Sequence, residues 1–276
     1  MPFITLTTDF GEKDHFVGAV KGAIYSELED IRIVDISHSI SPFHSTEAAY
    51  IIQRAYKSFP QGTIHIIGID SELNPENRHI ALLLDGHYFV CADNGIISML
   101  TAEVNPEKIV EINIHDRIFS NFPVLDVFVK VACHLARGGT LEVIGKPISE
   151  IKELIGIQPV VNNESTQIIG NVIYIDNYGN VVSNINKTLF DKVGKGRDYK
   201  ITARRANFDV VHTHYSDAIN FEIPKERREE DGKKLAVWNS AGFLELAIYK
   251  SNPTTVGSAA TLFGLEFRDA VTVNFI

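Results

Sequence analysis

The sequence has few cysteines, no long apolar run and no excess of basic residues, and each shortage excludes a class of protein. Its two cysteines, Cys91 and Cys133, lie far apart in apolar runs, so we expect buried, reduced thiols rather than a disulfide or a metal site. No apolar stretch approaches the roughly 18 residues that a membrane-spanning helix needs. The net charge of −9 opposes binding to a phosphate backbone. We therefore expect neither a membrane nor a nucleic-acid partner.

The beginning of the sequence lacks a basic segment followed by an apolar segment and a cleavage site. We therefore predict a cytoplasmic protein. The 276 residues are 45% hydrophobic and 22% charged, which is an ordinary globular composition. This length suits two domains or one large α/β domain.

Two patterns follow one another along the chain. Up to about residue 150, β-rich runs such as FITLTT and TIHIIGI alternate with helical patterns such as DHFVGAVKGAIYSELE. From about residue 167, strands such as QIIGNVIYID and FLELAIY follow one another without long helices. We predict an α/β N-terminal domain with a mostly parallel central sheet, residues 1–160, and an all-β, barrel-like C-terminal domain, residues 167–276. The polar stretch VVNNEST, residues 160–166, is the predicted linker.

Asp9 stands just past the first predicted strand, where open α/β sheets bind their ligands. Its carboxylate can accept two hydrogen bonds from a vicinal diol such as a ribose, and Gly11 would allow the ligand to approach the backbone closely. A helix cap followed by a turn glycine explains the same pattern. For Asp14, just before a helical pattern, capping is at least as good an explanation as binding.

Other polar residues follow the next predicted strands, and all of these strand ends would meet at one crevice. Asp70 follows the third strand, and Arg78 returns from the same loop; the two side chains either fix a small polar molecule or pair with each other. Asn94 stands in the sequence ADNG at another strand end, where a tight turn is the alternative to a ligand contact. His38 and His44 lie in a proline-containing turn and are more typical of a structural role.

The second predicted domain contributes polar turns of its own. YIDNYGNVVSNI contains Asp176 and Asn180, HYSDA contains Tyr215, and NSAGFLELA contains Ser240. Each segment alone is typical of a hairpin turn.

Together and in this order, these segments resemble the S-adenosyl-L-methionine (SAM) hydroxide adenosyltransferase family, which is related to the SAM-dependent fluorinases and chlorinases. The matching segments are TDFGEKDHFVGAVKG, VDISHSISP, ADNG, DVFVKVACHLARGG, IDNYGNVVSNI and NSAGFLELA. The resemblance implies hydrolysis of SAM to adenosine and L-methionine, by attack of water or hydroxide on C5′, without a cofactor. It also implies a homotrimer in which the first domain of one subunit and the second domain of its neighbour complete each site.

The resemblance assigns roles to matching residues. Asp9 would bind the ribose diol, Asp176 the methionine ammonium group, and Ser240 would lie near the methionine carboxylate. Asn180 would recognise adenine and Tyr215 would stack on it. The remaining candidates for substrate binding are Phe43 as an aromatic wall, Phe122 beside the nucleophile, Asp14 and Asn94.

The chain departs from the family pattern where water would be activated. Asp70 matches the aspartate of that set, but Asn77 stands at the arginine position, with Arg78 one place later, and Pro123 stands at the histidine position. Val124 replaces the small hydroxyl residue of the halogenases, which also lack the Asp70 carboxylate. The candidate catalytic residues are therefore Asp70 and Arg78, with His79 as a further possible replacement.

Two other functions compete with hydrolysis. The first is a non-catalytic SAM or adenosine binding protein that has lost part of the water-activating set. The second is a metal-dependent hydrolase using Asp9, Asp14, Asp70 and nearby histidines, which is disfavoured because no pair of ligands has the spacing of a metal site.

Overall fold

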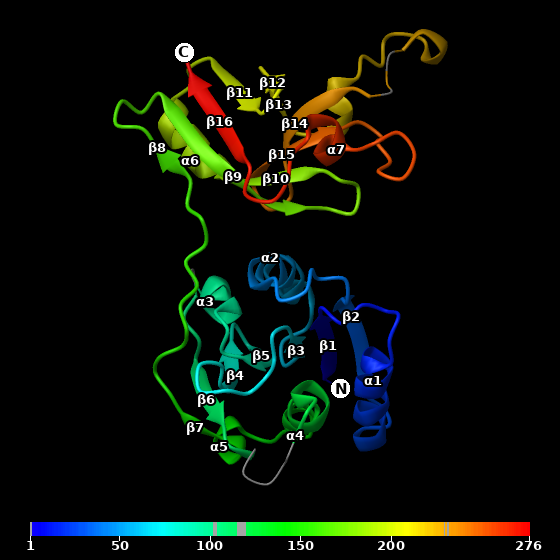
Figure 1. Cartoon of the computed structure of the whole chain (residues 1–276), viewed down its shortest axis with the longest axis vertical. Coiled ribbons are helices and arrows are strands. Elements are labelled where there is room, and N and C mark those ends of the chain that lie inside the picture. The colour runs from blue at the N-terminus through cyan, green and yellow to red at the C-terminus, as the bar shows by residue number, and fades with distance from the viewer. Residues whose placement is uncertain (1, 102–103, 115–119, 229, 231) are drawn as a thin grey trace. The chain divides into compact units, whose positions relative to one another are not determined.

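The computed structural model describes residues 2–101, 104–114, 120–228, 230 and 232–276. The chain divides into two compact units, residues 1–156 and 157–276 (Figure 1). Both cysteines are buried and unpaired, as the sequence predicts. Burial raises the pKa of the Cys133 thiol to about 11 and that of Cys91 well above its ordinary value, so both stay protonated and unreactive.

The first unit contains a mixed sheet with the strand order β2-β1-β3-β5-β4-β6-β7. Its strands are β1 (Phe3–Thr8), β2 (Arg32–Ser37), β3 (Ile64–Gly68), β4 (His79–Leu84), β5 (His87–Ala92), β6 (Lys108–Ile112) and β7 (Gly145–Pro147). Pairing is parallel from β2 to β5 and antiparallel from β5 to β7. The predicted mostly parallel sheet is therefore correct for one half only. Asp85 and Gly86, both with positive φ, form the tight turn that makes β4 and β5 an antiparallel hairpin.

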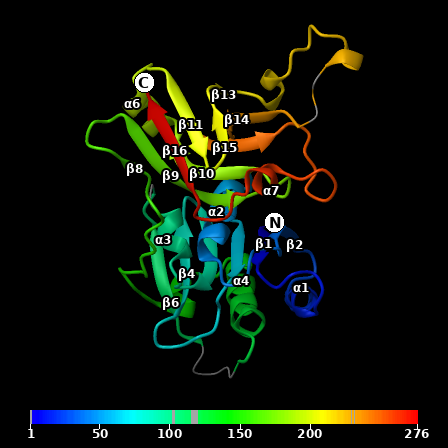
Figure 2. The same cartoon turned by 45° about the horizontal axis from the view of Figure 1, so that its top comes forward.

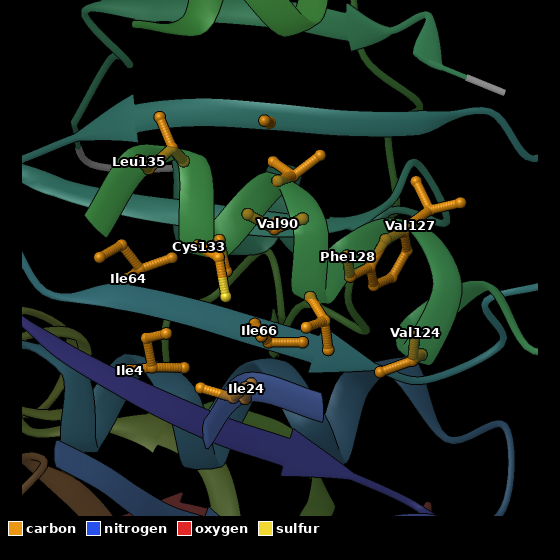
Figure 3. Packing of buried hydrophobic residues seen from close by; sticks show 14 of the residues in the cluster. Ile4, Ile24, Ile64, Ile66, Val90, Val124, Val127, Phe128, Cys133 and Leu135 are labelled. Atoms are coloured by element: carbon orange, nitrogen blue, oxygen red, sulfur yellow. The ribbon is translucent and has the colours of Figure 1, made fainter. Parts of the chain in front are cut away.

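Helices cover both faces of this sheet. They are α1 (Phe16–Glu27), α2 (Ser45–Ala55), η1 (Tyr56–Ser58), α3 (Ile96–Leu100), the π-helical turn η3 (Val124–Phe128), α4 (Val129–Ala136) and α5 (Leu141–Ile144). Successive strand residues point to opposite faces, so Ile66 packs with α1 and α4 whereas Ile67 packs with α2 and α3. Figure 3 shows the first of these cores, in which Cys133 and Phe128 lie over Ile66 and Val90.

The second unit is built on a strongly curved, nearly barrel-shaped sheet (Figure 2). Its strands are β8 (Val160–Val161), β9 (Gln167–Ile175), β10 (Val181–Asn186), β11 (Tyr199–Ala203), β12 (Ala206–Phe208), β13 (Val211–His212), β14 (Lys234–Trp238), β15 (Phe243–Ile248) and β16 (Ala270–Phe275). The order is β12-β11-β16-β9-β10-β15-β14-β13, with β8 beside β9. The short helices of this unit are α6 (Lys187–Gly194), η4 (Tyr215–Ala218), η5 (Lys225–Arg227) and α7 (Ala259–Phe263).

The segment 160–166 is a hairpin, not the predicted linker. Val160 and Val161 pair with β9, and the Asn162 side-chain oxygen accepts hydrogen bonds from the backbone N–H groups of Thr166 and Gln167. A polar composition is typical of both linkers and turns. This segment is a turn because Val160 and Val161 before it pair with β9 after it. Within the described residues, no helix is both long enough and apolar enough to cross a membrane.

Candidate functional site

A cavity of about 740 Å³ opens in the first unit where the neighbouring parallel strands β1 and β3 end. Four of the predicted site residues, Asp9, Phe43, Asp70 and Phe122, line this cavity. The other lining residues are Phe10, Phe16, Pro42, Ser71, Glu72, Leu73, His79, Ser120, Asn121, Pro123 and Val127. The cavity thus collects the strand-end aspartates at the sheet edge where open α/β folds bind ligands.

Asp9 is held at the cavity wall by its backbone surroundings. One carboxylate oxygen accepts a hydrogen bond from the backbone N–H of Phe43, at 2.9 Å. Partial burial raises the pKa of Asp9, and the neighbouring Asp70 charge raises it further, although the Phe43 N–H acts in the opposite direction. A carboxylate has about four acceptor positions, so Asp9 retains capacity for ligand hydroxyls.

His38 supports the turn that carries Asp9 and does not line the cavity. Its Nδ1 lies 2.8 Å from the Thr8 hydroxyl, and its Nε2 lies 3.0 Å from an Asp35 oxygen. Lys21 contacts the other oxygen of Asp35, and the His38 carbonyl accepts the Gly11 N–H. Burial alone would raise the pKa of Asp35, but the hydrogen bonds from Lys21 and His38 lower it. The buried His38 side chain thus contacts the end of β1 and Asp35, as expected of a structural histidine.

Asp70 stands at the start of a loop, residues 69–77, whose first residues line the cavity. Its backbone φ of 42° lies in the left-handed region, which is uncommon for residues other than glycine. Asn77 ends the loop, and its side-chain NH₂ donates to the carbonyls of Asp70, at 2.7 Å, and Glu72, at 3.0 Å. Asn77, which stands where the resemblance predicts an arginine, therefore holds the loop by hydrogen bonds to two of its carbonyls.

Aromatic rings form one wall of the cavity. Phe10, Phe16 and Phe122 contact one another, with ring centroids 5.3 to 5.7 Å apart. The Ser120 hydroxyl accepts the Phe122 N–H, which fixes the backbone there. Phe43 lies at the rim, with 74% of its surface exposed and φ at 61°. Phe10 and Phe16 were not predicted from the sequence as site residues, although Phe10 directly follows Asp9.

Three predicted site residues of this unit do not line the cavity. The Arg78 guanidinium lies 2.9 Å from a carboxylate oxygen of Asp93 and also donates to the Glu150 carbonyl. Asn94 donates to the Ile69 carbonyl, at 2.8 Å, and its oxygen accepts the N–H of the first residue of α3. Asp14 is exposed and does not cap α1, because His15 occupies the cap position.

Asp176 and Asn180 lie together in the turn between β9 and β10 of the second unit. One Asp176 oxygen accepts the backbone N–H groups of Tyr178 and Asn180, and the other accepts the Asn180 side-chain NH₂ at 3.0 Å. Asp176 therefore builds the turn that presents its own carboxylate. Tyr178, at the tip of this turn, is exposed.

Tyr215 and Ser240 lie on other elements of the second unit. The Tyr215 hydroxyl donates to Glu245 at 2.5 Å, and Ser240 is exposed in the turn between β14 and β15. Burial raises the pKa of Glu245, a change that the hydrogen bond from Tyr215 opposes. The sequence analysis missed Glu245, although a single acid inside the apolar strand FLELAIY is a recognisable signal.

Two family models match the chain in order. The SAM hydroxide adenosyltransferase N-terminal domain matches residues 4–145, and the C-terminal domain of the same family matches residues 170–272. The chain belongs to this family. The resemblance predicted from the sequence motifs is thereby confirmed.

This SAM hydroxide adenosyltransferase family member is similar to proteins with two different names. A protein named (R)-S-adenosyl-L-methionine hydrolase from Methanocaldococcus jannaschii is 27% identical over 99% of this chain and 96% of its own length. A fluorinase from Actinopolyspora mzabensis is 25% identical over 89% of this chain and 90% of its own. The crystal structure of an uncharacterised conserved protein from Thermotoga maritima has a TM-score of 0.82, at 28% identity, over 99% of this chain and 100% of that one.

Apart from His79, the ionisable residues that line the cavity are acidic. Among the described residues that line it, Asp9, Asp70 and Glu72 carry carboxylates, and no lysine or arginine is present. Grouped carboxylates of one sign attract cations and repel anions. In the described part of the chain, no three histidine, cysteine, aspartate or glutamate side chains are grouped as a metal site requires.

Pro123 and Val124 stand at the entrance to the π-helical turn η3. Pro123 lines the cavity, whereas Val124 is fully buried in the first core and faces Gly68. Neither side chain can donate a hydrogen bond to an ion in the cavity. His79 is the imidazole that does line the cavity, and it comes from the start of β4.

Proposed function

We propose that the protein hydrolyses SAM to adenosine and L-methionine by a single displacement at C5′. The observation that carries the proposal is the cavity shared by Asp9 and Asp70, which has carboxylates and aromatic rings but no lysine or arginine among its described lining residues. A sulfonium cation is favoured by both kinds of group, through Coulomb attraction and through contact with ring faces. Membership of the SAM hydroxide adenosyltransferase family supports the same substrate.

In the proposed step, a water oxygen attacks C5′ as the bond from C5′ to sulfur breaks. The bonding electrons stay on sulfur, which leaves as the neutral thioether of methionine, and the water proton passes to Asp70 or to solvent. Asp70 orients the water by accepting its hydrogen bond. The sulfonium is already a good leaving group, so alignment inside the cavity supplies most of the catalysis.

The same residues favour water over chloride as the nucleophile. The carboxylates of Asp9 and Asp70 repel an anion at this position. Pro123, which lines the cavity, offers no hydrogen bond that would compensate a chloride ion for its lost water.

We also propose that the enzyme works as a cytoplasmic homotrimer. Asp9 and Asp70 belong to the first unit, whereas Asp176, Asn180, Tyr215 and Ser240 belong to the second. A neighbouring subunit would then supply the groups for adenine and methionine.

A second candidate function is non-catalytic binding of SAM or adenosine. It is favoured by Arg78, whose guanidinium pairs with Asp93 and does not line the cavity, and by Pro123 at the family histidine position. In this function the cavity binds the nucleoside, but no arginine cation assists the formation of hydroxide.

Incubation of the purified protein with SAM in chloride buffer, followed by chromatography, separates these functions. We expect adenosine and methionine in equal amounts, with slower formation by the Asp70→Asn variant. Formation of 5′-chloro-adenosine would contradict the choice of water. Calorimetry that detects SAM binding without any adenosine formation would establish the non-catalytic function instead.

A further inference from the structure

We propose that Asn77 and His79 are positioning residues that hold the Asp70 loop in the shape its carboxylate needs to orient water. This inference rests on the proposed hydrolysis. Asn77 stands where the resemblance predicts an arginine, and His79 is the histidine considered above as a replacement for the one that Pro123 displaces. In the structure, the side chains of Asn77 and His79 donate hydrogen bonds to the carbonyls of the loop that carries Asp70.

The carbonyls at the start of the loop are held by side chains, one after another. Asn94 donates to the carbonyl of Ile69, Asn77 to those of Asp70 and Glu72, and His79 to that of Ser71, at distances of 2.7 to 3.0 Å. In a strand, such carbonyls accept hydrogen bonds from the backbone of a neighbouring strand. In residues 69–72 they accept hydrogen bonds from side chains instead.

The Asn77 amide is oriented by its contacts. Two carbonyl oxygens can be satisfied only by the NH₂ end of the side chain, so the assignment of nitrogen and oxygen is fixed chemically. Its Oδ1 is buried and has no hydrogen-bond partner among the described residues. A buried acceptor without a partner is costly, and the two bonds to the loop offset that cost.

The hydrogen bond that His79 makes also shows which ring nitrogen carries a proton. A carbonyl oxygen only accepts, so Nε2 must carry the proton in the contact with Ser71. The ring is fully buried and lies against Phe128 edge to face, with centroids 4.8 Å apart. Packing and the hydrogen bond together fix the ring beneath the loop.

Asp70 needs this support for two reasons. Its φ of 42° is a conformation that most residues avoid, and its charge is close enough to Asp9 to raise the pKa of that residue. Repulsion between the two carboxylates would move a loosely held loop away from the cavity. The side chains of Asn77 and His79 oppose this movement through their hydrogen bonds to the loop carbonyls.

The first test is a double-mutant cycle on turnover. Asn77→Leu, which removes both donors, should lower kcat by about tenfold and leave KM within about twofold, because Asp9 and the aromatic wall of the cavity are unchanged. The same substitution in an Asp70→Asn background should have almost no further effect. His79→Leu should behave like Asn77→Leu, whereas His79→Gln, which retains a side-chain N–H, should recover much of the rate.

A general loss of stability is controlled by Gly139→Ala, in the turn after α4, where a Cβ would meet the His134 ring. Its kcat at a temperature where it is folded should match that of the natural protein. Equal losses from Asn77→Leu in the presence and absence of the Asp70 carboxylate would overturn the inference.

The second test does not depend on turnover. Titration of the aspartate carboxyl carbons by NMR should show a lower pKa for Asp9 in folded Asn77→Leu, because Asp70 has moved away. If the natural protein forms no adenosine, the proposed hydrolysis fails, but this titration still tests the support of the loop. An unchanged Asp9 titration in the folded variant would overturn the inference.

Discussion

Asp9 and Asp70 line the same cavity but have different surroundings. Asp9 is partly buried, accepts the Phe43 N–H and has a raised pKa, whereas Asp70 extends from a left-handed position at the start of a loop. A fixed carboxylate with spare acceptor positions suits a neutral diol. A carboxylate on a loop beside the proposed attack site suits water.

Replacing Asp9 by Asn should weaken adenosine binding by at least about tenfold, because each hydrogen bond to a charged group contributes roughly 1.5 to 3 kcal/mol. Isothermal titration calorimetry measures the effect. The matched control is Asp30→Asn, an exposed aspartate that does not line the cavity and should bind adenosine like the natural protein. Equal affinities for the Asp9 and Asp30 variants would remove Asp9 from the site.

Adenosine binding should weaken on acidification at a higher pH than an ordinary aspartate would cause. Burial and the Asp70 charge raise the pKa of Asp9, so protonation begins earlier as the pH falls, and the neutral acid is a weaker acceptor for ribose hydroxyls. Asp70→Asn removes the second cause and should move the midpoint to lower pH. Calorimetry over a series of pH values checks this, and a midpoint that does not move would contradict the coupling.

Two separate sets of side-chain contacts fix the strand ends that carry Asp9 and Asp70. The chain of contacts from Lys21 through Asp35 and His38 to Thr8 fixes the end of β1, whereas side chains from beyond β3 fix the Asp70 loop. Thr8 and His38 in the first chain of contacts, and the Asn77 NH₂ group in the second, are buried donors or acceptors with fixed partners. Such groups position backbone accurately because leaving them unpaired is costly.

Two glycines in the same unit should respond to alanine in opposite directions. A Cβ on Gly145 would collide with the Glu111 carbonyl in the neighbouring strand β6, so Gly145→Ala should destabilise the unit by about 1 to 3 kcal/mol. Gly22 lies inside α1 with open space around it, so Gly22→Ala should stabilise by roughly 0.5 to 1 kcal/mol. Thermal unfolding compares them, and a shift of the same sign in both would contradict the packing.

The candidate site residues are divided between the two units. The first has the acidic and aromatic cavity, and the second has the turns of Asp176 and Ser240 and the Tyr215 ring beside Glu245. Family models match both units, so both belong to the family's shared architecture. If one ligand contacts both units, as proposed, a stable homotrimer would keep the two sets of binding groups together.

Light scattering coupled to size-exclusion chromatography should give the mass of a trimer, because the proposed site takes its second unit from a neighbour. The trimer should persist when adenosine is removed. A monomer that binds adenosine with full affinity would show that one chain is sufficient and would contradict the proposed assembly.

Much of the candidate site was predictable because its residues stand in local patterns. Asp9, Asp70 and Phe122 each follow a strand or precede a helix, and the cavity contains all three. Arg78 and Asn94 have equally suggestive positions, yet the structure places them on Asp93 and on the Ile69 carbonyl. A residue's distance along the chain from a strand end does not specify the direction of its side chain.

The sequence by itself determined the family, the reduced cysteines and the change from α/β to β-rich structure, because these depend on residue types and on short periodic patterns. Only the tertiary structure decided that segment 160–166 pairs with β9, that the first sheet is mixed, and that Asn77 and His79 meet carbonyls of the Asp70 loop. The physical reason is that a hydrogen bond depends on which groups the packed strands bring within about 3 Å, and strand register is a property of the whole sheet.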